Sequence, residues 1–151
     1  MKRVVLAGLN ACPRCQRAVA FLKVEGEEYT IGVSIDASKA WEISYSRREP
    51  GENKSLAGLL LELMARYSHV PYQVVLDCDK RGFLNARVNM TGAGTMDSFS
   101  CSVTEGVGLA AVAAIPLYVE EKVFEHSQLL HPGTPEEEID LVQPKAKVTL
   151  H

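Results

Sequence analysis

Residues 72–90, YQVVLDCDKRGFLNARVNM, decide the fold of this chain of 151 residues. Two runs of alternating polarity flank a turn that ends at Gly82, which is the pattern of a β-hairpin. Along the second run, every other residue is apolar: Leu84, Ala86, Val88 and Met90. Since side chains alternate across a strand, one face of this hairpin is buried, and Arg87 on the other face is placed to point into a cleft.

The segment upstream of this hairpin predicts a second one. Apolar runs at residues 4–9 and 18–24 flank a long tip, and a β-branched run follows at residues 29–35. Asp36 is a suitable N-cap for a short helix over residues 37–43, because its carboxylate can accept from free backbone N–H groups. Residues 46–54 are polar and contain a proline and a glycine, so we expect a loop there.

Two helices of different character are predicted farther along the chain. Apolar residues recur at helical spacing, and we expect their stripe to face the core: Leu56, Leu59, Leu60, Leu63, Met64 and Tyr67. Residues 105–114 are mostly small and apolar, so they predict a central, buried helix. Residues 96–102 favour another strand, and Pro116 indicates either the start of a short strand over 115–119 or an edge position for it.

Composition bounds the fold class. The chain is 46% hydrophobic and 23% charged, as in an ordinary globular protein. Together with the predicted elements, this indicates an α+β fold: a single compact domain that has a mixed or antiparallel sheet with hairpins and about three to four helices. We expect the domain over residues 1–130 and a polar, proline-containing C-terminal tail over residues 131–151.

The same composition limits the compartment and the partners. The apolar run near the start breaks at Asn10, too early for a signal-peptide core, and no stretch approaches the roughly 18–20 apolar residues of a membrane span. We therefore expect a cytoplasmic protein that does not cross a membrane. Its net charge of −3 is the opposite of the strongly basic balance of nonspecific nucleic-acid binders, so nucleic acid would have to meet a local basic patch.

A family resemblance is carried by the order and spacing of these elements. VEGEE at residues 24–28 precedes IGVSIDA at 31–37; the helix over 56–67 and the hairpin over 74–88 follow, and LAAVAAIPLYV at 109–119 comes before Val123 and His126. In this order, the chain resembles the bifunctional nuclease family, long catalogued as a domain of unknown function. The resemblance extends over roughly residues 2–130. It implies the fold of that family and, as an activity, hydrolysis of DNA or RNA.

The polar positions of that family are matched in part. Lys39 stands where the family tends to have an acidic residue early in the first helix, and Ala57 and Gly58 stand where a His-Asp pair is expected. The Ser-Arg-Pro-Ser-Asp that usually opens the small-residue helix is CSVTE here, at residues 101–105, which keeps a hydroxyl and an acid. The apolar frame therefore carries over more fully than the polar signature.

Four residues form the candidate catalytic set. Phosphodiester hydrolysis needs carboxylates that hold a divalent metal, or a base that activates water, and a cation that stabilises the developing charge. Asp36 and Glu105 stand at predicted helix starts, where free N–H groups also favour an anion, and Lys39 and Arg87 supply positive charge. A divalent metal would be the cofactor. The alternative is that Asp36 and Glu105 only cap helices, and that Lys39 forms a solvated pair with Glu42.

Short basic pairs on turns are the candidate contacts to a nucleic-acid backbone. Arg47 and Arg48 lie in the predicted loop, and Arg81 lies in the turn of the central hairpin. Such pairs are also common on ordinary protein surfaces, so this alternative stays open.

Cys12 and Cys15 form a C-x-x-C motif on the predicted hairpin tip, which is how a zinc knuckle presents two thiolates. A tetrahedral site needs two more ligands, and Cys78 and Cys101 supply them only if the fold brings both to the tip. A redox pair and a simple turn are the other interpretations.

Two functional classes follow from these residues. The first is a nuclease that acts on DNA or RNA. The second is a non-catalytic binding or regulatory domain on the same fold, which forms a homo-oligomer. Catalytic groups must share a site, whereas helix caps need not, so the two classes differ in whether Asp36, Lys39, Arg87 and Glu105 meet in one concave pocket.

Overall fold

The computed structural model describes residues 1–12, 14–48, 55–126, 129–130 and 148–149. Its elements are, in chain order, β1 (Lys2–Ala11), β2 (Arg17–Val24), β3 (Thr30–Asp36), α1 (Ala37–Arg48), α2 (Leu56–Arg66), β4 (His69–Cys78), β5 (Leu84–Gly92), β6 (Thr95–Cys101), α3 (Val103–Ala113), β7 (Leu117–Val119), α4 (Glu121–His126), β8 (Leu129–Leu130) and β9 (Val148–Thr149). None of the helices in these ranges is both long enough and apolar enough to span a bilayer.

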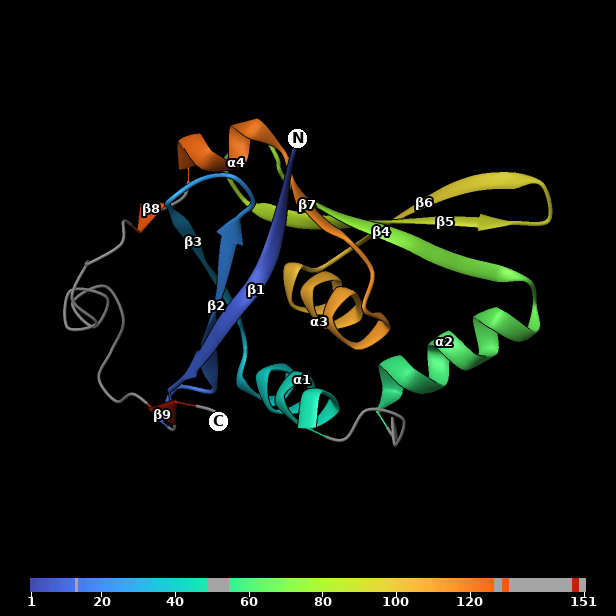
Figure 1. Cartoon of the computed structure of the whole chain (residues 1–151), viewed down its shortest axis with the longest axis horizontal. Coiled ribbons are helices and arrows are strands. Elements are labelled where there is room, and N and C mark those ends of the chain that lie inside the picture. The colour runs from blue at the N-terminus through green and yellow to red at the C-terminus, as the bar shows by residue number, and fades with distance from the viewer. Residues whose placement is uncertain (13, 49–54, 127–128, 131–147, 150–151) are drawn as a thin grey trace.

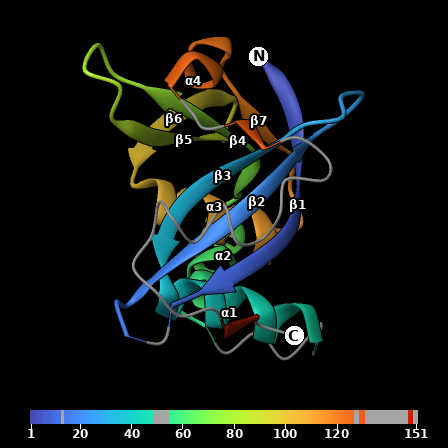
Figure 2. The ribbon, with the colours of Figure 1, turned by 90° about the vertical axis from the view of Figure 1, so that its left-hand side faces the viewer.

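The strands form one mixed sheet in the order β6-β5-β4-β7-β1-β2-β3-β8, with β9 beside β1. Its neighbouring strands are antiparallel except for β4 and β7, which run parallel. Figures 1 and 2 show how the twisted sheet curls around α3. The chain is thus a single compact α+β domain, and the sequence prediction of fold class is confirmed.

Both predicted hairpins are present, and the register of each follows the alternation in the sequence. In the first, Val4 lies opposite Val24. In the second, Val74 lies opposite Val88. Of the predicted tail, residues 131–147 lie outside the described part of the chain, whereas Val148 and Thr149 pair with the end of β1.

Pro116 precedes an inner strand rather than an edge strand. Strand β7 lies between β4 and β1, so the prediction of a strand start was right and the alternative of an edge position was wrong. The physical reason is that Pro116 stands just before the strand, where its missing N–H removes no ladder bond. Its carbonyl still accepts a hydrogen bond of 3.0 Å from the N–H of Val74.

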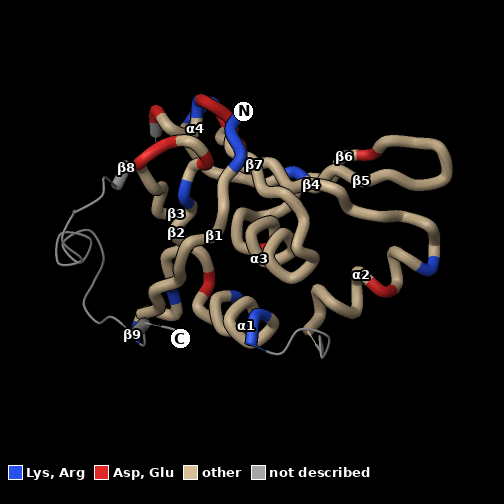
Figure 3. The backbone as a smooth tube through the Cα atoms, in the orientation of Figure 1, with Lys and Arg blue, Asp and Glu red and all other residues tan. Residues whose placement is uncertain are grey.

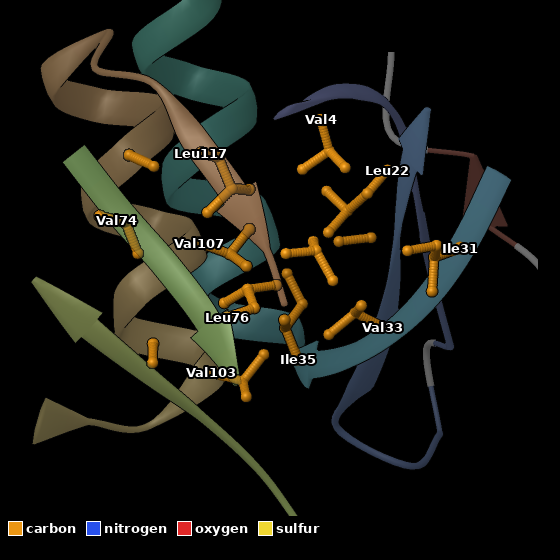
Figure 4. Close-up of a cluster of buried hydrophobic side chains, with 14 of the residues drawn as sticks. Val4, Leu22, Ile31, Val33, Ile35, Val74, Leu76, Val103, Val107 and Leu117 are labelled. Atoms are coloured by element: carbon orange, nitrogen blue, oxygen red, sulfur yellow. The ribbon is translucent and has the colours of Figure 1, made fainter. Parts of the chain in front are cut away.

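The core lies between the sheet and α3. Figure 4 shows aliphatic side chains of β1, β2 and β3 meeting those of β4, β7 and α3. Helix α3 packs closely because it contains glycine at its contacts: a Cβ at Gly106 would collide with Ala86, and one at Gly108 would collide with the side chain of Lys39. The prediction of a central, buried helix from its small residues is therefore confirmed.

Helix α1 is longer than the sequence analysis predicted. It continues to Arg48, so Arg47 and Arg48 lie in its last turn and not in a loop. No helix-breaking residue occurs before Pro50, and basic residues in a last turn complement the helix dipole. The rest of the predicted loop, residues 49–54, lies outside the described residues.

Helix α2 corrects the prediction that its apolar stripe faces the core. Five residues of that stripe are 44–77% exposed, and we call them the α2 face: Leu56, Leu59, Leu60, Leu63 and Tyr67. Ala57 is buried, and Met64 is partly buried against the core. The helix packs mainly against α3 and β4, and its outer leucines remain exposed.

Candidate functional site

Three of the four predicted catalytic residues lie where α1 and α3 begin. The Lys39 Nζ is 2.8 Å from Glu42 Oε2 and 3.2 Å from Glu105 Oε2, so one cation joins the two helices through two carboxylates. The backbone N–H of Asp36 donates to the Thr104 hydroxyl in the first turn of α3, over 3.2 Å. The starts of both helices are thereby held together.

Lys39 is buried, so the expectation of a solvated surface pair with Glu42 was wrong. Its aliphatic stem lies against Gly108, where only a glycine leaves room for it. Burial acts to lower the pKa of Lys39, but hydrogen bonds to Glu42 and Glu105 outweigh it and the pKa is raised. Lys39 is therefore a fixed positive charge that two acids neutralise, while the second oxygen of Glu42, Oε1, is buried without a hydrogen-bond partner in the described part of the chain.

Asp36 and Glu105 have partners of their own. The Asp36 carboxylate pairs with Arg17 at 3.1 Å, and both side chains are about half exposed. The backbone N–H of Glu105 donates to the hydroxyl of Ser102, which caps α3. The Glu105 side chain is 60% exposed, so it can turn away from Lys39 into solvent.

Arg87 does not join these residues. Its Nη2 lies 3.4 Å from Glu120 and 3.8 Å from Asp77, and Lys122 binds the same Asp77 at 2.8 Å. The neighbour of Arg87 on the strand, Val88, lines the face of the sheet that carries α3, so Arg87 points to the opposite face. The four residues therefore lie at two places, one on each side of the sheet.

An apolar groove of about 590 Å³ opens beside Lys39, between α2, α3 and the β5–β6 hairpin. Its described lining includes one basic and one acidic residue, Lys39 and Glu105, and the rest are mostly apolar or aromatic: Leu56, Ala57, Leu60, Leu63, Met64, Tyr67, His69, Val88, Met90, Phe99, Cys101 and Leu109. A volume in this range suits a small ligand or a few side chains of a partner.

The predicted backbone-binding arginines are spread over the molecule. Arg47 donates to the carbonyl of Leu6 over 3.0 Å and lines a second cavity of about 390 Å³ beside β1 and α3. Arg81 lies in the exposed turn between β4 and β5. Arg48 is exposed at the end of α1. None of the three lines the groove.

The two cysteines of the C-x-x-C motif lie at the tip between β1 and β2, partly exposed. A hydrogen bond between the thiols lowers the pKa of Cys12 and raises that of Cys15. Cys78 is buried at the end of β4, and Cys101 lines the groove. Among the residues that the structure describes, no three histidine, cysteine or acidic side chains gather as a metal site, so a four-thiolate zinc site is not assembled there.

The groove is the feature that sequence reasoning missed. An apolar stripe on a helix is the usual sign of packing against a core, and nothing in residues 56–67 distinguishes a covered stripe from an open one. Known proteins supply no correction, because a scan against protein-family models and a search of the curated proteins both find no match for this chain.

Proposed function

We propose that this chain is a non-catalytic binding domain, which uses the groove beside α2 to bury an apolar surface of a partner. The observation that carries the proposal is the exposure of the α2 face, four of whose five residues line that groove. Full burial of one leucine or aromatic side chain is worth about 1.5–3 kcal/mol, so a set of such side chains left open to water favours any partner that covers it.

The pairing of the cations with acids supports binding over catalysis. Lys39, the cation of the groove, is neutralised by two carboxylates, and Arg17 and Arg87 are each paired with acids as well. A cation already paired with acids gives little attraction for a phosphate. The proposal keeps the cytoplasm as the compartment and a homo-oligomer as the working form.

Uptake of an apolar fluorescent probe tests the proposal. Anilinonaphthalene sulfonate should gain fluorescence with the dilute protein, and Leu60→Glu should remove more than half of that gain, because the new carboxylate stands in the groove wall. The matched control is Phe83→Glu, which changes an exposed aromatic side chain outside the groove and should leave the gain intact. Equal loss in both variants, or in neither, would refute the groove as the binding surface.

A nuclease is the second candidate, because Asp36, Lys39 and Glu105 gather where two helices begin. Free N–H groups at helix starts attract phosphate oxygens, and the exposed acids Asp36 and Glu105 are the ones that would hold a divalent metal. DNA or RNA would be the substrate.

Incubation with labelled single-stranded and duplex DNA and RNA, with and without added Mg²⁺ or Mn²⁺, separates the two candidates. The binding-domain proposal expects no cleavage. Metal-dependent cleavage that disappears in the double variant Asp36→Ala, Glu105→Ala would establish the nuclease instead. Lys23→Ala serves as the control, since it removes an exposed cation of β2 that lies opposite Thr30, at the other end of β3 from Asp36.

A further inference from the structure

The α2 face is large enough to be one half of a protein interface. Large apolar side chains have areas of roughly 150–250 Å² each. The α2 face and Phe99 together therefore expose on the order of 600 Å², at the upper end for patches on monomers and close to the roughly 800 Å² that each partner gives to a standard interface. A small ligand in the groove would leave Leu59 uncovered, because Leu59 does not line it.

This surface also carries little charge, and its β6 part contributes one carboxylate, Asp97, which accepts a hydrogen bond from the Thr95 hydroxyl. On α2, Glu62 and Arg66 form an ion pair with each other at 2.7 Å. Figure 3 shows that charged residues gather around α4 and the N-terminus, whereas the region of α2, β5 and β6 carries few of them. A surface with so little net charge attracts a charged partner only weakly and repels a second copy of itself only weakly.

Strand β6 forms the outer edge of the sheet next to this surface. It pairs with β5, and no other described strand lies beside it (Figure 1). Natural edge strands are usually protected by charged side chains, above all lysine, by proline or by a bulge. TMDSFSC contains neither lysine nor proline, Asp97 is its single charged residue, and its pairing with β5 is regular. Six of its seven residues are exposed. An open edge of this kind is a template for pairing with another strand.

We propose that the partner is a second copy of this chain, docked about a two-fold axis so that the two β6 strands pair antiparallel and the two α2 faces cover each other. The inference rests on the proposed binding function and names its partner. A two-fold axis at the edge keeps α2 of both copies on the same side of one continuous sheet. One partner then covers the edge strand, Phe99 and the α2 face together.

The sequence of β6 favours a particular register. Pairing centred on Ser98 places Asp97 of each copy opposite Phe99 of the other. Pairing centred on Asp97 would bring two carboxylates face to face, which is unfavourable in a sheet. The proposed two-fold axis therefore passes beside Ser98 and not beside Asp97.

The first test is the mass of the full chain in solution, measured by light scattering and sedimentation from low to high micromolar concentration. We expect a dimer, and Leu63→Glu should weaken it by about tenfold or more, because it places an unpaired charge in the interface. Leu56→Glu is the second variant: residue 56 starts the helix, where an acid favours folding. Phe83→Glu should remain dimeric, and circular dichroism checks that all three variants are folded.

The second test traps the strand pairing. Facing residues in antiparallel strands have Cα atoms about 4.5–5.5 Å apart, which is within reach of a disulfide. Under mild oxidation, Ser98→Cys should form a covalent dimer whose disulfide joins the two residues at position 98, as peptide mass mapping can show. Lys23→Cys, on an exposed position of β2, should not cross-link efficiently.

Each outcome bears on a different part of the proposal. A monomer at all concentrations that still binds the apolar probe would overturn the second copy and leave the binding function standing. A monomer that binds no probe would overturn both. A dimer that Leu63→Glu and Leu56→Glu leave unchanged uses another surface, and a dimer that fails to trap at position 98 refutes the pairing of β6.

Discussion

Helices α2 and α3 have the same length, eleven residues, and yet they meet opposite environments. Helix α3 contacts α1, α2, β3, β4 and β5, and five of its residues are buried. Helix α2 contacts α3 and β4, and Ala57 is its one buried residue. The helix with the clearer amphipathic pattern is thus the more exposed of the two.

The difference teaches what each sequence pattern measures. Small residues such as Gly106 and Gly108 indicate that another element approaches the helix closely. Each glycine lies where a neighbouring side chain leaves no room for a Cβ. A leucine stripe indicates only that exposing this side of the helix to water is unfavourable in free energy. The stripe does not indicate whether a sheet, a ligand or a second molecule covers it.

The largest expected effect comes from placing an aspartate in each helix and comparing the losses of unfolding free energy. Val107→Asp puts an unpaired carboxylate in the core of α3, which should cost at least about 3 kcal/mol and prevent cooperative folding. Leu60→Asp changes a half-exposed side chain of α2 and should alter the unfolding free energy of the dilute monomer by about 1 kcal/mol or less. Urea unfolding followed by circular dichroism measures both. Comparable losses would show that α2 is covered within the monomer.

A smaller effect is expected from exchanging glycine and alanine, and the two opposite exchanges should both destabilise, for a different reason in each helix. Alanine is normally the better helix former, but Gly106→Ala should destabilise by about 1–3 kcal/mol, because the new methyl group overlaps the side chain of Ala86. Ala65→Gly, at an exposed site of α2, should cost about 1 kcal/mol by propensity alone. Stabilisation by Gly106→Ala in thermal unfolding would contradict the close packing of α3.

Much of the fold was predictable because it is decided by local patterns. Alternation in residues 72–90 predicted the central hairpin, and small residues predicted the buried helix. The inner position of β7 was not predictable, since three residues after Pro116 do not state which strands flank them. The family resemblance to bifunctional nucleases stays a prediction, because no comparison with known proteins tests it.

The candidate site was predictable only in part. Glu105 was selected for its position at a helix start and Lys39 for its positive charge, and the structure brings them into contact. Arg87 was selected on its strand face, and the side of the sheet on which it lies depends on tertiary packing. The groove exists because the outer side of α2 is left uncovered. Residues far from α2 in the sequence determine this, so the sequence of α2 alone does not predict it.

A change of pH probes the link between α1 and α3 at the edge of the groove. The pKa of Lys39 is raised above its usual 10.5, so its ion pairs stabilise the fold below that pH, and this contribution is lost as pH rises through the folded-state pKa. The unfolding free energy of the wild type should therefore fall above about pH 10.5 more steeply than that of Lys39→Met. Lys23→Met, which changes an exposed lysine, should keep the wild-type slope. Identical slopes for all three proteins would mean that Lys39 is not held by its acids.

The smallest expected effect separates the charged face of α2 from its apolar face. Glu62→Gln removes the ion pair with Arg66 on this helix, and an exposed i,i+4 pair is worth a few tenths of a kcal/mol that salt screens. Unfolding curves of the two proteins should therefore differ slightly at low salt and coincide at high salt. If Glu62→Gln also leaves the mass in solution unchanged while Leu63→Glu lowers it, the two faces of one helix are separated: the charged face meets only water, and the apolar face requires a partner. A dimer that dissociates equally in both variants would place the ion pair in the interface and move the two-fold axis away from the α2 face.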